Sequence, residues 1–205
     1  MKNNKIPAFL IVFIPLMLLP GLLVGQTWKF IKEKDGVQLF TRDEKGKNLK
    51  FIKGVAEFSQ SAEKIYALIE DVNHTEWWDS NLKQIKVLQY EKNKHSQLYM
   101  VYSMPWPFKS RDMSVNMTTT INQMSGEYKV IAVPLSGVTP EIKDFVRIKE
   151  YRQIWTLKPV NNKTHIELEF YVDPVENIPA WLLNMILIDT PINSIKALRQ
   201  MMEKK

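Results

Sequence analysis

MPWPFKSRD, residues 104–112, separates two segments that have the composition of β-strands. One segment, Ser96 to Ser103, precedes it, and the other, Met113 to Ile121, follows it. Proline lacks a backbone N–H and its ring fixes φ, so Pro105 and Pro107 do not both fit in the ladder of a central strand. The sequence therefore predicts a strand, a rigid bend and a second strand.

The strand after the bend has an alternating pattern of side chains. Met113, Val115 and Met117 stand at every second position, so they share one face of the strand. Arg111 has the same parity, which places a guanidinium at the start of an apolar row. A buried charge without a partner is costly, so we expect Arg111 to have a partner or water. Asp112 faces the opposite side of the strand, and a direct pair between these neighbours is not expected.

The rest of the chain predicts mainly antiparallel strands joined by short turns. Turn-forming residues in DEKGKN, KNK and QMSGE separate segments with strand-like patterns. An amphipathic helix is predicted at Ala62 to Glu70, after two candidate cap residues, Ser59 and Ser61. The predicted strands are residues 37–42, 49–58, 85–91, 95–103, 113–122, 128–133, 146–159 and 163–172.

The chain ends in a segment with helical periodicity. Pro179 stands near its start, and Pro191 is expected to kink it. The apolar residues of this segment form one stripe along the predicted helix. Burying that stripe against the apolar face of a curved sheet is the natural way to pack one long helix with many antiparallel strands. The stripe has a spacing of three to four residues and consists of Trp181, Met185, Ile188, Ile192, Ile195, Leu198 and Met202.

PWPFKSRD resembles the "P…RD" signature of START (StAR-related lipid transfer) domains, especially their bacterial members. Four further stretches agree in the same order over residues 28–202: WKFIKEKDGVQLFTR, DVNHTEWWDSNLKQIKVL, YRQIWTLKP and DPVENIPAWLLN. The resemblance implies an α+β helix-grip fold of the START/Bet v1-like superfamily. In this fold a curved antiparallel sheet of about seven to nine strands wraps around a long C-terminal helix. It also implies that residues 26–205 form a START-like lipid-binding domain.

A cavity between sheet and helix is the implied binding site. Methionine is frequent at the inward positions, and it suits an adaptable apolar pocket as well as a closed core. Arg111 would meet a polar head or a buried carboxylate, or it would be tied to protein groups at the bend. Counting from Arg111, Leu98 and Met117 stand where sterol-type members carry a carboxylate and an arginine, which disfavours a clamp for a sterol hydroxyl. The expected cavity residues are Trp78, Leu98, Met100, Tyr102, Arg111, Met113, Val115, Met117, Phe170, Trp181, Met185, Ile188 and Ile192.

Two loops are expected to form a mobile rim around this cavity. Pro134 to Asp144 is a long loop with two prolines and a glycine, and such loops often carry binding function. Trp77 and Trp78 are adjacent in the polar loop 71–80, so their side chains point different ways. One indole would pack on the core while the other lines a mouth or touches lipid, or both would be structural.

These features favour non-enzymatic binding, with possible transfer, of a lipid or another hydrophobic small molecule. The alternatives are a polyketide cyclase or hydrolase-like enzyme of the same superfamily and a cell-envelope interaction protein with a closed core. The sequence has no HExxH, GxSxG or P-loop motif, and His74, His95 and His165 stand far apart. We therefore expect no catalysis, no metal and no cofactor.

Charge and cysteine content limit the partners. The 205 residues carry a net charge of +6 without a long basic run, and no nucleic-acid-binding motif is present. A mixed, solvated surface is the simplest interpretation, and transient contact with an anionic membrane is the alternative. The absence of cysteine excludes disulfides and thiolate metal sites. We expect a monomer that binds no nucleic acid.

Residues 1–25, MKNNKIPAFLIVFIPLMLLPGLLVG, have the layout of a secretory signal. Lys2 and Lys5 precede an uncharged apolar run, residues 6–24, and Gly25 stands before the polar Gln26. The alternative is an uncleaved membrane anchor, since about 20 apolar residues suffice to span a bilayer. In either case the domain is expected to be exported, as a periplasmic, secreted or membrane-anchored protein.

The signal interpretation predicts the N-terminus of the mature protein. Protein made in its own host should begin near Gln26, because about 25 residues are removed on export. N-terminal sequencing measures this directly. A mature chain that still begins at Met1 would favour the anchor.

Overall fold

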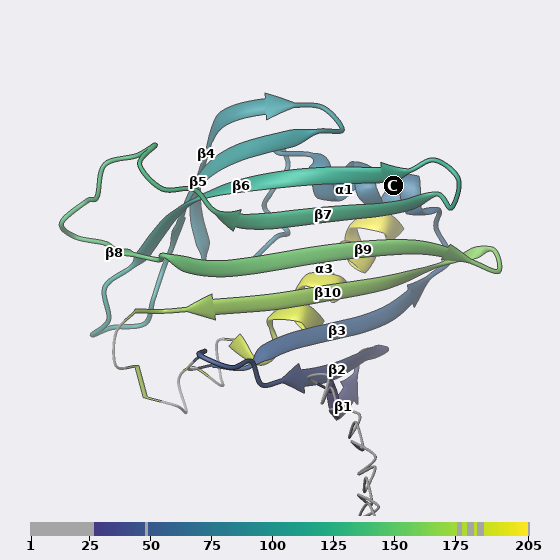
Figure 1. Cartoon of the computed structure of the whole chain (residues 1–205), viewed down its shortest axis with the longest axis horizontal. Helices are drawn as coiled ribbons and strands as arrows, with labels where there is room; N and C mark the ends of the chain where they lie inside the picture. Colours follow the sequence, from purple (N-terminus) through teal and green to yellow (C-terminus); the bar gives the residue numbers. More distant parts are fainter. Residues whose placement is uncertain (1–26, 48, 176–177, 180–182, 184–186, 205) are drawn as a thin grey trace, which may run out of the picture.

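The computed structural model describes residues 27–47, 49–175, 178–179, 183 and 187–204. In this part of the chain a strongly curved sheet carries helices α1 (Ala62–Glu70) and α3 (Thr190–Glu203) on the same side (Figure 1). The predicted α+β class, with a curved antiparallel sheet and a C-terminal helix, is confirmed. The strands are β1 (Lys29–Lys34), β2 (Val37–Arg42), β3 (Phe51–Phe58), β4 (Leu82–Glu91), β5 (His95–Tyr102), β6 (Arg111–Asn122), β7 (Glu127–Pro134), β8 (Val146–Arg147), β9 (Glu150–Val160) and β10 (Lys163–Asp173).

The order of the strands brings the two ends of the chain together in the sheet. The path is β1-β2-β3-β10-β9-β7-β6-β5-β4, so β3 from the start of the chain pairs with β10 near its end. Nine strands form this antiparallel path, within the predicted range. The turns of β9–β10 and β6–β7 lie at one end of the sheet, and the bend between β5 and β6 lies at the other (Figure 1).

The strand expected at residues 146–159 is divided in two. Val146 and Arg147 form β8, which pairs in parallel with Arg111 and Asp112 at the start of β6. The chain then leaves β6 and continues as β9, beside β7 and β10. The alternating pattern contained no sign of this break, because both parts have the composition of a strand.

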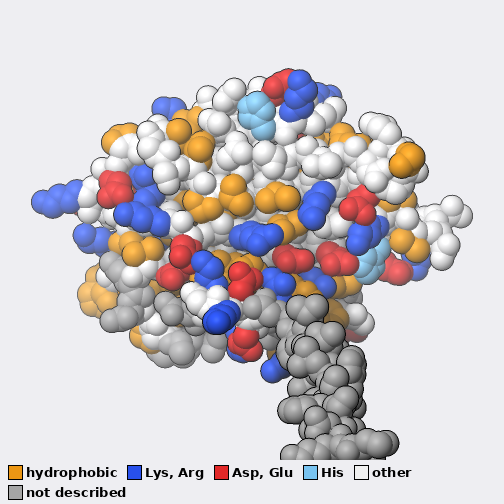
Figure 2. Space-filling model, viewed as in Figure 1, with side chains coloured by type: hydrophobic (Ala, Val, Ile, Leu, Met, Phe, Trp, Pro, Cys, Tyr) orange, Lys and Arg blue, Asp and Glu red, His pale blue; other side chains and the backbone are white. Residues whose placement is uncertain are grey.

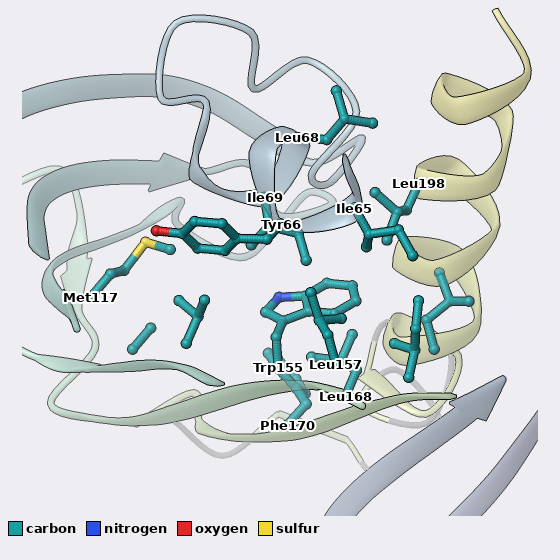
Figure 3. Close-up of a cluster of buried hydrophobic side chains, with 14 of the residues drawn as sticks. Ile65, Tyr66, Leu68, Ile69, Met117, Trp155, Leu157, Leu168, Phe170 and Leu198 are labelled. Atoms are coloured by element: carbon teal, nitrogen blue, oxygen red, sulfur yellow. The ribbon is translucent and has the colours of Figure 1, made fainter. Parts of the chain in front are cut away.

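Helix α1 has the predicted bounds and the predicted buried stripe. The side chain of Ser61 accepts a hydrogen bond from the backbone N–H of Lys64, which identifies Ser61 as the cap. Ile65, Leu68 and Ile69 are buried in the core between the sheet and the helices. Figure 3 shows Ile65 meeting Leu198 of α3 above the side chains of the sheet.

Helix α3 differs from the prediction of one long kinked helix. It begins at Thr190, with Pro191 in its first turn, and a turn at Ile188 and Asp189 precedes it. The described residues Leu183 and Leu187 before this turn are also helical, so the helical pattern breaks within a turn of Pro191, where a kink was predicted, and the missing N–H of proline costs nothing in the first turn of α3. Ile192, Ile195 and Leu198 are buried as the periodicity predicted.

Helix α3 approaches the sheet closely at Gly54 of β3. A Cβ on Gly54 of β3 would lie 2.8 Å from the Pro191 Cβ and 3.0 Å from the Ile195 Cδ1. Real Cβ atoms do not approach so closely, and the proline ring cannot rotate away. Gly54 therefore sets how near α3 lies to the sheet.

We predict that Gly54→Ala lowers the free energy of unfolding by about 1–3 kcal/mol, because overpacking forces α3 away from β3. Thermal and urea denaturation measure the change. Gly46→Ala is a suitable control, since nothing lies within 4 Å of its added Cβ and only its positive φ of 80° opposes the change. A Gly54→Ala protein as stable as the parent would contradict this assignment.

Candidate functional site

A cavity lies between the inner face of the sheet and the helices. Its volume is about 110 Å³. One water molecule occupies roughly 10–15 Å³ of a cavity volume measured in this way, so there is room for on the order of eight waters. The space is lined from β5, β6, β7, β9 and β10, from the loop that contains Trp77 and Trp78, and from residues on both sides of the start of α3.

The inward rows of β5 and β6 form much of the wall. The ladder places Met100 opposite Met113 and Tyr102 opposite Arg111, so each pair shares the inner face. The sheet and its loops bring together eight of the thirteen expected residues at this cavity: Trp78, Met100, Tyr102, Arg111, Met113, Val115, Met117 and Phe170. That any of them contacts a ligand stays a prediction.

The remaining expected residues do not line the cavity or are not described. Leu98 and Ile192 are fully buried in the hydrophobic core, away from the cavity wall. Ile188 is half-buried and packs against the same core. Trp155 and Leu157 are buried in this core beneath α1 (Figure 3), and Trp155 also borders the cavity. Trp181 and Met185 lie outside the described residues.

Arg111 faces the cavity at the bend, as its parity predicted. Its side chain is only 1% exposed, and its Nη1 donates a hydrogen bond to the backbone carbonyl of Lys109. This bond ties the guanidinium to the residues of the bend, which was one of the two interpretations of the sequence. The bend therefore positions Arg111 and offsets part of the free-energy cost of burying its charge.

Asp112 is buried on the other face of the same strand. Its carboxylate receives two hydrogen bonds from Arg147, Nε to Oδ1 and Nη2 to Oδ2, both at 2.8 Å. The hydroxyl of Tyr99 donates to Oδ2 at 2.9 Å, and burial raises the pKa of this tyrosine to about 12. Arg147 and Tyr99 together offset the desolvation of this carboxylate, because its charge is paired and both of its oxygens accept hydrogen bonds.

The Pro134 to Asp144 loop packs on this outer face and does not form the rim expected from the sequence. The Ser114 and Thr139 hydroxyls are 2.8 Å apart, and Arg147 donates to the Pro140 carbonyl at 2.8 Å. Among the described residues, none of this loop lines the cavity. The other expected rim, with Trp77 and Trp78, does line it.

Asp79 brings a carboxylate to the cavity wall. Its Oδ1 accepts a hydrogen bond from the backbone N–H of Asn81 at 2.7 Å. Burial raises the pKa of this carboxyl, and hydrogen bonding from Asn81 only partly opposes that effect. Tyr102 and Tyr151 also line the wall, and burial together with the nearby Asp79 charge raises the pKa of both phenols.

Apart from Tyr102 and Arg111, the polar part of the wall was missed from the sequence. Asp79 and Asn81 come from a loop, whose side-chain directions no periodicity reveals. Tyr151, Gln153 and Trp155 come from β9, and their alternation in YRQIWTLKP was a usable signal. The cavity therefore has more polar groups than the rows of β5 and β6 suggested.

Two features of the described residues bear on other classes of site. They contain no group of three or more His, Cys, Asp or Glu side chains placed to hold a metal ion. They also contain no helix that is both long and apolar enough to cross a membrane. The predicted export segment, residues 1–25, lies outside the described part of the chain.

A family model for the START domain matches residues 22–205. The chain belongs to the START domain family. An uncharacterized protein of Pseudomonas aeruginosa is 29% identical to it over 188 residues, which are 90% of this chain and 91% of that protein.

Solved structures show the same START fold. A STAR-related lipid transfer protein of Xanthomonas axonopodis matches with a TM-score of 0.76 and 24% identity, over 86% of this chain and 98% of that one. Human StAR-related lipid transfer protein 5 matches with a TM-score of 0.75 and 15% identity, over 86% of each chain. An aromatase/cyclase of Streptomyces matches less well, with a TM-score of 0.50 and 7% identity, over 75% of this chain and 93% of that one.

Proposed function

We propose that this START domain is a non-enzymatic carrier that binds a lipid or a similar hydrophobic molecule in the cavity. The observation that carries the proposal is the mainly apolar wall on which Met100, Met113 and Met117 meet Trp78 and Phe170. Flexible thioethers and large aromatic rings adapt to an elongated apolar guest better than to a polar substrate.

The size of the cavity sets the scale of the binding energy. A methylene group is about as large as a water molecule, so the space suits a chain of roughly eight carbons. Each buried CH₂ contributes about 0.8 kcal/mol, which gives on the order of 6 kcal/mol before ordering costs are subtracted. A longer chain would need the cavity to widen, and the flexible methionine side chains of the wall allow that.

The same cavity gives less support to a cyclase or hydrolase. Its described lining contains no histidine, serine–histidine pair or metal cluster. Asp79 is the one described carboxylate on the wall, and no histidine or second carboxylate of the described lining stands beside it to form an acid–base pair. A carrier needs only an apolar wall that buries the chain of the ligand and a few polar groups that bind its head group. The lining of this cavity contains both kinds of side chain.

Enlarging Met117 tests the proposal, because this side chain lies on the cavity wall. In Met117→Trp the indole should occupy the space, weaken binding of a fluorescent fatty alcohol by at least tenfold and leave the melting temperature within a few degrees. The stability is retained because the larger side chain fills a void and does not overpack a filled core.

Leu98→Trp is the matched control. Leu98 lies on the neighbouring strand β5 but in the closed core, so the same enlargement should cost about 1–3 kcal/mol or more. A Met117→Trp protein that melts as early as Leu98→Trp, from a parent that binds no fluorescent lipid, would falsify the carrier proposal.

A carrier must meet a membrane, and we propose that it does so with the end of the sheet where the β5–β6 bend lies. Trp106 of the bend is 92% exposed, and Val138 and Ile142 are exposed in the adjoining loop. Lys109 joins the two segments by donating to the Lys143 carbonyl at 3.3 Å. Tryptophan favours the membrane interface and lysine favours anionic lipids, so this end suits an anionic bilayer.

Figure 2 shows a contrast between this end and the broad outer face of the sheet. Over β3 and β10 basic and acidic side chains are intermixed, with ion pairs such as Lys53–Glu167 and Lys163–Glu57. At the left end, where β8 lies, Lys and Arg side chains stand beside hydrophobic ones. Acidic side chains are also present at this end, where Glu141 pairs with Lys149, so its exposed hydrophobic side chains are what distinguish it from the balanced face.

We predict that Trp106→Ala weakens binding to vesicles of phosphatidylcholine with phosphatidylserine by at least fivefold. Co-sedimentation with vesicles measures the bound fraction. Met124→Ala is the control, because Met124 is 97% exposed but lies in the β6–β7 turn, at the opposite end of the sheet. Equal effects of the two substitutions would contradict the proposed orientation.

A further inference from the structure

The wall of the cavity contains two indole N–H donors whose hydrogen bonds are not made within the described part of the protein. Trp77 and Trp78 both line the space, and their rings meet edge to face with centroids 6.4 Å apart. Nε1 of each indole is buried and has no acceptor among the described residues. A buried donor left unpaired costs free energy, so an acceptor on a ligand would be stabilised here.

An acceptor stands next to these donors in the sequence and on the same wall. Asp79 follows Trp78 directly, and its Oδ1 is held by the Asn81 backbone N–H. No described Lys, Arg or His forms an ion pair with this carboxylate, so its charge is not neutralised by that part of the chain. A ligand that donates a hydrogen bond to Asp79 would be favoured for that reason.

Three kinds of head group can be compared with this arrangement. A carboxylate or phosphate accepts from the indoles, but it brings a second negative charge beside Asp79 in a medium of low dielectric constant. An ammonium group pairs with Asp79, but it leaves the indole donors unpaired unless they face its counter-ion. A hydroxyl or an amide both donates and accepts, so it satisfies Asp79 and an indole together.

Arg111 does not reverse this preference. It lines the same cavity and would attract an anion, but it donates to the Lys109 carbonyl at the bend. Its charge is therefore already part of a set of protein contacts, whereas the described hydrogen bonds to Asp79 come from Asn81, a neutral residue. The charge of Arg111 favours an anionic head group, whereas the charge of Asp79 disfavours one. Ligands that differ only in the charge of the head group show which effect is larger.

We infer that the cavity selects amphiphiles whose head group is a neutral hydroxyl or amide, recognised by Asp79 and the indoles of Trp77 and Trp78. This inference rests on the proposed function and narrows it to a class of ligand. It disfavours free fatty acids and other anionic lipids whose head group has no hydrogen-bond donor as the preferred cargo.

Four probes with the same twelve-carbon chain test the inference: dodecanol, dodecanamide, dodecanoate and dodecyltrimethylammonium. Each is titrated below its micelle concentration against the full domain loaded with the neutral dye Nile red, and dye displacement gives the affinity. At pH 7.5 we expect dodecanol and dodecanamide to bind at least tenfold more tightly than dodecanoate or the ammonium.

Two conservative variants assign the preference to particular residues. Asp79→Asn removes the charge but keeps an oxygen for Asn81, so dodecanoate should gain affinity, dodecanol should lose its charge-assisted hydrogen bond, and the ratio of the two affinities should fall at least fivefold. Trp78→Phe keeps an aromatic ring on the wall and removes a donor, so dodecanol should weaken a few-fold more than Nile red does. Thermal melts of both variants show whether the fold is retained.

The outcomes separate this inference from the proposed function. Tighter binding of dodecanoate or of the ammonium than of dodecanol overturns the inference, as does an Asp79→Asn protein with unchanged ratios. Equal binding of all four probes overturns the inferred head-group selectivity, but it remains consistent with the proposed carrier function. If neither Nile red nor any probe binds, the carrier proposal fails, and the inference fails with it.

Discussion

Helix α3 lies close to the sheet only because residue 54 is a glycine. Its position there determines where the closed core ends and where the cavity begins, since Ile192, Ile195 and Leu198 fill the space beside β3. On another side of the same helix, Thr190 and Ser194 line the cavity. One helix thus closes the core over part of the curved sheet and borders the open space over another part, and a shift of the helix would change both at once.

Two neighbouring residues on β6 show how one strand serves two sides of the sheet. Arg111 points into the cavity, whereas Asp112 is paired with Arg147 and Tyr99 on the outer face. Because Asp112 holds Arg147, and Arg147 holds the Pro140 carbonyl, the outer loop is fastened to the strand that forms the wall. The wall is therefore supported from behind by buried, charge-assisted hydrogen bonds, which keep its inner face in place.

Periodic elements could be predicted from the sequence, whereas loops could not. Alternation along β6 correctly placed Met113, Val115 and Met117 on one face, and helical spacing correctly placed the buried stripe of α3. The separate start of α3 at Thr190 was missed, because Pro191 in a helical pattern fits a kink and a first turn equally well. Asp79 was missed because a loop side chain has no period that fixes its direction.

The segments around the cavity differ in how many backbone hydrogen bonds hold them in place. Strands β5, β6, β7, β9 and β10 are joined by continuous ladders, and opening them would break many hydrogen bonds at once. The segment with Trp77 and Trp78 is held by isolated turn bonds, such as Trp78 N to the Thr75 carbonyl at 3.0 Å. For a carrier, we therefore propose that a ligand enters on the side of this segment, which also brings the two indoles and Asp79 to the cavity wall. Opening of the cavity and the proposed recognition of the head group would then depend on the same short segment, which has few backbone hydrogen bonds to break.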